Sequence, residues 1–499
     1  MTALLERDVQ VKPGGSGRRG IFANTPNQLK LLTAALVVLG LVLGLVAALG
    51  LMRDSSSMSS LKSRTTEVSA TSDLYYRLND MDAQAANLLL VGYHPEAGFD
   101  VPVTVNAQAS YATYNTDRSK ADADLERIAE NPALNAEASK LLDTLGGYEA
   151  DIADAFYIDQ QAASQKPGTP PSAALGEYEQ ASAMLHNSLL PASLQITTQD
   201  NSAVGASYSS DHSAISTFGY AVLGVALLTV LALFLGNRYY ARKFRRRVSW
   251  LAVGAVAALV VGLLGLSTQL GEASHLHVAK QDAYDSIYAL DRAQAVSDDA
   301  NADESRWLLE NQSAALQTSF FQKAIEVGGV SSVSSAQEAA QAAADPSSYY
   351  SALSTATDGL SVNSAANTVS HVGIDGFLGS ELNNVTFPGE AEAAYSATQD
   401  YDAYIQDDGK IRTDAEAGNL AGAVSIDIGL SAGQSNHDFN TYMTALGQVI
   451  QINTQQFNAA VSAGQSDLGA TAWAELVIAE LLLLSLVTCA GYLRLREYR

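Results

Sequence analysis

The chain has 499 residues, with 29 Lys and Arg against 53 Asp and Glu, and a formal net charge of −24. A chain this acidic lacks the cationic surface that displaces counterions from phosphates, so DNA and RNA are excluded as ligands. Only 16% of the residues are charged and 47% are hydrophobic, which is unusual for a soluble acidic protein. The composition therefore predicts that the apolar residues gather in blocks.

Four apolar runs provide these blocks. The first, residues 31–52, contains one polar residue, Thr33. At 1.5 Å per residue it is long enough to cross a hydrocarbon core about 30 Å thick. The sequence predicts four transmembrane helices, at residues 30–52, 218–236, 249–268 and 473–493.

The cations gather at the ends of these spans. Residues 1–29, the tail 494–499 and above all the linker 237–248, which has six cations and no acid, are basic. By the positive-inside rule they face the cytoplasm, so we expect a multi-pass plasma-membrane protein with both termini inside. Residues 53–217 and 269–472 are then exported, with 9 cations against 22 acids and 6 against 26.

The exported regions have helical periodicity. Apolar residues recur with a mean spacing of 3.5, which is typical of a helical bundle, at Leu134, Ala138, Leu141, Leu145, Tyr148, Ile152 and Ala155 and again at Leu74, Leu78, Met81, Ala85 and Leu88. The only cysteine, Cys489, lies in the fourth span, so neither exported region can contain a disulfide. We predict an all-α fold, with a four-helix bundle at 53–217, a second helical bundle at 269–472, and a Gly-rich loop at 372–389.

Short similarities suggest that the two halves arose by internal duplication. Ile196-Thr197-Thr198-Gln199 precedes the second span, and Ile452-Asn453-Thr454-Gln455 precedes the fourth. Asp73 and Tyr75 have the same spacing as Asp282 and Tyr284. Each half would be a span, an exported bundle and a span, as expected for a repeat. In the first half, a continuous helix is expected over residues 188–236.

No motif for catalysis is present in the sequence. The predicted cytoplasmic segments are too short for a kinase or cyclase, and Gly-x-Ser-x-Gly, His-Glu-x-x-His and phosphate-loop patterns are missing. His275 and His277, near Glu272, point to different sides of a helix, which favours interfacial residues over a metal site. We expect no enzymatic activity, no cofactor and no metal.

Two groups of charged residues are candidate functional sites. The linker cations set the topology and are also candidate contacts for a cytoplasmic partner or for anionic lipid heads; they include Arg242, Lys243, Arg245, Arg246 and Arg247. Glu480 lies inside the fourth span, where an ionised carboxylate costs a few kcal/mol. It is either an intramembrane signalling contact or a protonated acid bonded to a hydroxyl such as that of Thr229.

The arrangement of spans and bundles resembles the exported sensor regions of chemoreceptors and sensor kinases. More narrowly, the anchor at 29–52, the Asp-x-Tyr helix starts at 73 and 282, and the two Ile-x-Thr-Gln segments resemble the GlnX-type four-span proteins of actinobacteria. That resemblance implies a relay from an amino-acid-binding lipoprotein outside to the serine/threonine kinase PknG inside. It implies no catalytic residue.

The function expected from the sequence is non-enzymatic transmembrane signalling. Its partners would be an extracytoplasmic solute-binding protein, a cytoplasmic protein kinase, the lipid bilayer and a second copy of the chain. Two alternatives are a structural envelope or scaffold protein and an accessory subunit of an amino-acid ABC transporter. Transport by this chain alone is disfavoured because its spans are almost purely apolar and have no polar path beyond Glu480.

Overall fold

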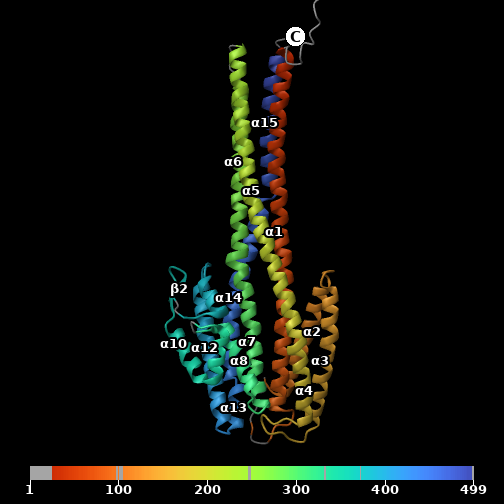
Figure 1. The fold of residues 1–499 in the computed structure, drawn as a ribbon, viewed down its shortest axis with the longest axis vertical. Helices are drawn as coiled ribbons and strands as arrows, with labels where there is room; N and C mark the ends of the chain where they lie inside the picture. Colours follow the sequence, from red (N-terminus) through yellow and green to blue (C-terminus); the bar gives the residue numbers. More distant parts are fainter. Residues whose placement is uncertain are drawn as a thin grey trace, which may run out of the picture. The chain divides into compact units, whose positions relative to one another are not determined.

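The computed structural model describes residues 25–96, 99, 105–244, 249–330, 333–370 and 373–496. It is 86% helical with almost no strand, which confirms the all-α prediction (Figure 1). The chain divides into two compact units. The span unit comprises residues up to Ser55, Ser213–Glu272 and Ser466 onward, and the bundle unit comprises Ser56–His212 and Ala273–Gln465.

Four helices contain the apolar runs: α1 (Thr25–Val91), α5 (Leu190–Phe244), α6 (Ser249–His277) and α15 (Ala470–Arg496). In the described part of the chain, four helical stretches are long and apolar enough to cross a membrane. Their length follows from runs of Leu, Val and Ala without an internal proline or a charged cluster. The chain is therefore a multi-pass membrane protein.

The span unit is held together by one buried stripe from each helix. Leu29, Leu36 and Leu43 of α1 are seven residues apart, and they share a core with stripes of α5, α6 and α15. This heptad spacing is typical of left-handed packing between helices. Gly262 allows α6 to approach α5 closely, because an added Cβ would lie 2.3 Å from Ala226 Cβ. Small residues at such contacts are common between membrane helices.

The first half of the bundle unit, residues 56–212, contains parts of α1 and α5 and the helices between them. These are α2 (Ala107–Ala129), α3 (Asn135–Gln161), α4 (Ser172–Met184) and the short π-helix η2 (Leu185–Leu189). The predicted stripe of α3 from Ala138 to Ala155 is buried, as is the stripe of α1 from Leu74 to Leu88. Both periodicities therefore identified faces that pack into the core.

The second half, residues 273–465, contains more and shorter elements. After α6 come the π-helix η3 (Val278–Tyr284), α7 (Asp285–Leu309), α8 (Ala314–Gly328), α9 (Ser335–Ala344), α10 (Pro346–Asp358), α11 (Gly376–Asn383), α12 (Glu390–Glu416), α13 (Leu420–Asp427) and α14 (Ser435–Asp467). An antiparallel hairpin joins β1 (Ser361–Asn363) to β2 (Thr368–Ser370), with Val362 opposite Val369.

The Gly-rich insert at 372–389 contains a helix, so the expectation of a loop there was wrong for α11. Leu378 and Leu382 lie one turn apart and are both buried in the second core. Burying this apolar pair stabilises a helical turn that the glycine content disfavours.

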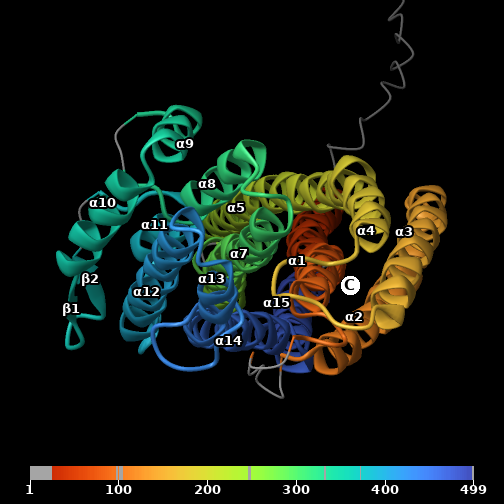
Figure 2. The same ribbon diagram turned by 90° about the horizontal axis from the view of Figure 1, so that it is seen from below.

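The two halves of the bundle unit share a core. Trp307, Leu308 and Leu309 at the end of α7 belong to the same buried cluster as the residues from Leu74 to Val91 of α1. Seen end-on in Figure 2, α7 lies between α1 on one side and α8 and α13 on the other. The bundles that the sequence separates are thus one packed body.

The last helices of the two halves differ. The helix expected over 188–236 is observed as α5, Leu190–Phe244, without a break. In the second half, Leu468 and Gly469 interrupt the helix between α14 and α15. Glycine is the weakest helix former after proline, which is consistent with a break at this position.

Two leucines of α3 provide a test of this packing. Leu145 is 1% exposed and Leu142 is 50% exposed. We expect Leu145→Ala to lower the free energy of unfolding by about 2–5 kcal/mol because it leaves a cavity. Leu142→Ala should change it by about 0.5 kcal/mol or less. Thermal unfolding of the full chain in detergent measures both, and equal effects would contradict the assigned face of α3.

Candidate functional site along the buried helix α7

Helix α7 buries charged residues on all of its sides. Every residue from Ala295 to Leu309 is buried, and the stretch includes three aspartates, a glutamate and an arginine. Charged side chains are almost never fully buried unless they are paired. The partners of these residues therefore determine what this helix can do.

The first group of partners surrounds Arg306 and joins the two halves of the bundle unit. This Arg306 cluster consists of Asp82, Ser182, His186, Asp299, Asp303, Arg306 and Lys323. Asp82 comes from α1, Ser182 from α4, His186 from η2 and Lys323 from α8, and the other three come from α7. Side chains from both halves thus meet at one buried point.

The distances in the Arg306 cluster are those of direct ion pairs. Arg306 Nη1 lies 3.3 Å from Asp82 Oδ2 and donates to Ser182 Oγ at 2.8 Å, while Nη2 pairs with Asp303. Lys323 Nζ lies 2.6 Å from Asp299 Oδ1 and 2.5 Å from Asp303 Oδ2. His186 Nε2 lies 3.1 Å from the same Asp299 oxygen. Two cations therefore neutralise most of the negative charge.

The pKa values of two neighbouring aspartates of α7 are shifted in opposite directions. Burial would raise the pKa of Asp299, but Lys323 and His186 hold this pKa well below its ordinary value. For Asp298, burial together with the nearby Asp80 and Asp117 raises the pKa well above the ordinary value. The surroundings therefore favour the ionised form of Asp299 and the protonated form of Asp298.

A second polar group, the Asp427 cluster, lies further along α7 and consists of Asn87, Glu304, Ser305, Asp427 and Ser435. Ser305 Oγ lies 3.0 Å from Asn87 Oδ1 and 3.1 Å from Asp427 Oδ2, and Ser435 Oγ donates to Glu304 Oε2 at 3.0 Å. Burial and the proximity of Asp408 raise the pKa of Asp427 to about 7. Burial and Asp427 raise the pKa of Glu304 as well.

Arg412 of α12 supports α7 from the second half. Its guanidinium lies 4.6 Å from the centre of the Trp307 ring and 5.0 Å from that of Phe320, and its Nε donates to Asp408 at 2.9 Å. Cation–π contacts of this kind are strongest when they are desolvated, and Arg412 is buried. Arg412 thus fixes the end of α7 against α8.

The Arg306 cluster contains three possible metal ligands. Ligand atoms of His186, Asp299 and Asp303 lie within 4.8 Å of one another. The ammonium group of Lys323 already contacts both carboxylates, so the charge that a divalent cation would bring is supplied by a side chain. The arrangement fits an internal ion-pair network better than a metal centre.

This polar contact surface is suited to rearrangement. An apolar interface loses stability steadily as it opens, because water solvates it poorly. A network of charged and hydrogen-bonded groups can exchange internal partners for water or for each other, and it specifies one register while closed.

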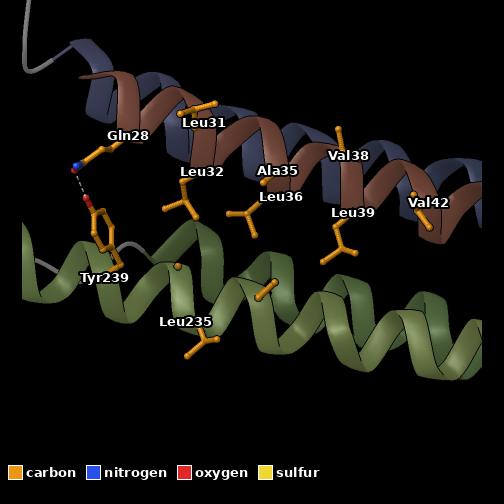
Figure 3. A pocket seen from close by; sticks show the side chains of 12 residues that line it. Gln28, Leu31, Leu32, Ala35, Leu36, Val38, Leu39, Val42, Leu235 and Tyr239 are labelled. Carbon is orange, nitrogen blue, oxygen red and sulfur yellow. Dashed lines mark hydrogen bonds between the residues drawn. The ribbon is translucent and has the colours of Figure 1, made fainter. Parts of the chain in front are cut away.

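The structure describes two of the five candidate partner-binding cations. Arg242 and Lys243 are exposed near the end of α5, while Arg245, Arg246 and Arg247 lie outside the described residues. Lys243 Nζ donates to Gln28 Oε1 at 2.6 Å and to Tyr239 Oη at 2.9 Å. Figure 3 shows Tyr239 hydrogen-bonded to Gln28 at one end of a groove that is lined mainly by Leu and Val of α1 and faced by Leu235 of α5. The volume of the groove is about 680 Å³.

Glu480 packs against α1 within the span unit. A Cβ added at Gly44 would lie 2.9 Å from the Glu480 carboxyl carbon, so the glycine provides room for this side chain. Neither Glu480 carboxyl oxygen has a hydrogen-bond partner among the described residues. Thr229 donates to Val225 O instead, so the expected bond between Glu480 and Thr229 is not formed.

The two clusters along α7 were missed by sequence reasoning. Residues 297–306 contain no apolar side chain larger than alanine, a pattern that predicts a solvated helix face. The one feature of the sequence that could have indicated these clusters is the scarcity of Lys and Arg. Residues 269–472 have only six, and Arg306, Arg412 and Lys323 are placed against buried acids.

Comparison with known proteins identifies the first half of the bundle unit. Residues 57–209 match the family model of the actinobacterial sensor domain. No curated protein and no solved structure matches the chain. The matched residues begin in α1 and end in α5. The chain is thus a multi-pass membrane protein in which one segment, residues 57–209, is similar to the actinobacterial sensor domain, and this similarity suggests a role in sensing and signalling.

Removing Arg306 tests the importance of its cluster. Arg306→Ala leaves Asp82 and Asp303 buried without their main partner, so we expect a loss of about 3–5 kcal/mol in the free energy of unfolding. Arg64→Ala removes an exposed arginine of α1 and should change it by about 0.5 kcal/mol or less. Denaturant unfolding of the purified chain gives both values. Similar losses in the two variants would show that the cluster contributes little.

The raised pKa values predict that stability falls as pH rises. Folded Asp427, with a pKa of about 7, and Glu381, whose pKa burial and Glu390 raise to about 8, hold protons that the unfolded chain releases near pH 4. The folded state therefore binds more protons between these values, and stability is lost as pH rises through about 7 and 8.

Asp427→Asn removes one of the carboxyl groups that make stability depend on pH. Its unfolding temperature should decline less than that of the wild type between pH 5 and pH 8, because the amide cannot ionise. Asp143→Asn, on the exposed face of α3, should follow the wild type. Parallel pH profiles for the wild type and Asp427→Asn would contradict a protonated Asp427.

Proposed function

We propose that the protein is a non-enzymatic transmembrane signal transducer. The observation that carries the proposal is the match of residues 57–209 to a sensor domain, in a chain with four helices suited to cross a membrane. The matched region begins in α1 and ends in α5, and each of these helices also contains one of the apolar runs. Because α1 and α5 are continuous helices, a displacement of either one in the sensor domain can be transmitted along the same helix into a membrane span.

The signal that fits the chain best is extracytoplasmic amino-acid availability, detected through a binding lipoprotein and relayed to a cytoplasmic serine/threonine kinase. The resemblance to GlnX-type proteins, which are linked with the kinase PknG, supports this proposal. Charge supports it as well, because exported regions with an acid excess repel free aspartate and glutamate. A separate solute-binding protein is then the better receptor for acidic amino acids.

The cytoplasmic output would pass through the basic linker 237–248. Its cations include Arg242 and Lys243, which are exposed on α5. A kinase with an acidic surface would find complementary charge there. In this proposal, docking of the lipoprotein shifts the α7 contact between the halves, and α1 and α5 transmit the change.

Deletion of the gene tests the relay. Phosphorylation of the kinase's substrates should no longer respond to added amino acids, and the wild-type gene on a plasmid should restore the response. Affinity capture after crosslinking should recover a lipoprotein and a kinase. An unchanged response without the gene would overturn the proposal. A defect in cell shape without nutrient dependence would point to an envelope scaffold, and loss of uptake would point to a transporter subunit.

A further inference from the structure

The sensor domain contains an open pocket that is separate from the α7 clusters. It has a volume of about 720 Å³ and lies between α2 and α3, with Tyr93 at one end. Pockets of about 300–1,000 Å³ are typical of small-molecule sites. The whole pocket falls within residues 57–209.

One wall of the pocket is aromatic. Phe156 packs edge-to-face against Tyr111 and Tyr114, with ring centres 5.7 and 5.5 Å apart. Tyr111 and Tyr157 are exposed, so their rings are accessible from the pocket. Tyr114 is buried, and its hydroxyl has no hydrogen-bond partner among the described residues. This wall offers ring faces that attract both apolar groups and cations.

Part of the α3 side of the pocket is made of small residues. Gly146, Ala150 and Ala153 follow one another at spacings of four and three, so they share one face of α3. A Cβ added at Gly146 would meet no atom within 4 Å. The pocket is therefore open because α3 lacks the side chains that would fill it.

One weak ion pair lines the pocket. Arg118 Nη1 lies 3.5 Å from Glu149 Oε2, and both side chains are partly exposed. Such a partly exposed pair contributes little to stability, so separating it costs little. Arg118 Nε has no hydrogen-bond partner in the described structure, which leaves the guanidinium with unused donors. Burial raises the pKa of Glu149 and Arg118 opposes the shift, so this carboxylate benefits from a cationic partner.

The chemistry of this ion pair selects the class of ligand. A ligand with only a carboxylate would bind Arg118 and leave Glu149 unpaired, and an amine would do the reverse. A zwitterion can satisfy both groups and carries no net charge against the acid excess of the domain. Its side chain would then contact the ring of Tyr111 or Tyr157.

We propose that this pocket binds a zwitterionic amino acid with an apolar or aromatic side chain, its carboxylate on Arg118 and its ammonium group on Glu149. This direct binding goes beyond the relay proposed above, in which a separate protein recognises the amino acid. The two proposals fail independently, because the pocket can be tested on the purified full chain with no lipoprotein present.

L-phenylalanine and two analogues that each lack one charge are the probes. Calorimetry on the full chain in lipid nanodiscs should show saturable binding of L-phenylalanine. Phenethylamine, which lacks the carboxylate, and 3-phenylpropionate, which lacks the ammonium group, should bind roughly tenfold or more weakly, equivalent to about 1.4 kcal/mol. Arg118→Gln should abolish the preference over phenethylamine, and Glu149→Gln the preference over 3-phenylpropionate.

Two glycine variants separate binding from folding. Gly146→Leu places a side chain in the pocket, meets no neighbour at Cβ and improves helix propensity, so it should fold and lose binding. Gly176→Leu on α4 also meets nothing at Cβ, lies outside the pocket and should bind as the wild type does. Binding that survives Gly146→Leu would assign the amino acid to another place and overturn the proposal. So would the absence of saturable binding for L-phenylalanine and the other apolar amino acids.

Discussion

The buried contact between Arg306 and the carboxylates around it is the constraint on which the bundle unit depends. Arg306 and Lys323 lie among Asp82, Asp299 and Asp303, which come from two halves of the chain. A buried charge is tolerated only when its partner is present, so neither half can complete this network alone. The apolar end of α7, from Trp307 to Leu309, then closes a core that both halves share.

Two adjacent carboxyl groups of α7 have pKa values that are shifted in opposite directions. Lys323 and His186 hold the pKa of Asp299 well below its ordinary value, while burial and the nearby Asp80 and Asp117 raise the pKa of the adjacent Asp298 well above it. Stability therefore comes partly from ion pairs and partly from protonated acids, which respond to different conditions. A body built this way holds its halves together specifically and still has polar contacts that water can replace. These properties suit a sensor that changes state.

Much of the fold could be predicted from the sequence, because burial in helices leaves a periodic pattern. The apolar runs lie within α1, α5, α6 and α15, and the stripes of α1 and α3 are buried as expected. The pattern fails for α7, since residues that are polar on all sides give no period to detect. It also fails for the pocket, whose residues Tyr93, Arg118 and Glu149 are far apart in the chain and meet only through packing. The roles of Arg242–Arg247 and Glu480 are still predictions.

The limits of the family match differ from the limits of the packed body that contains it. The family match covers residues 57–209, yet Asp82 and Asn87 within it find their partners on α7, beyond residue 290. A fragment cut at the limits of the match would lose Trp307, Leu308 and Leu309 from the core it shares with α7 and leave Asp82 without its cation. The segment that sequence comparison recognises is therefore shorter than the compact unit into which it is packed. Mutations on α7 would alter the sensor domain from outside its own limits.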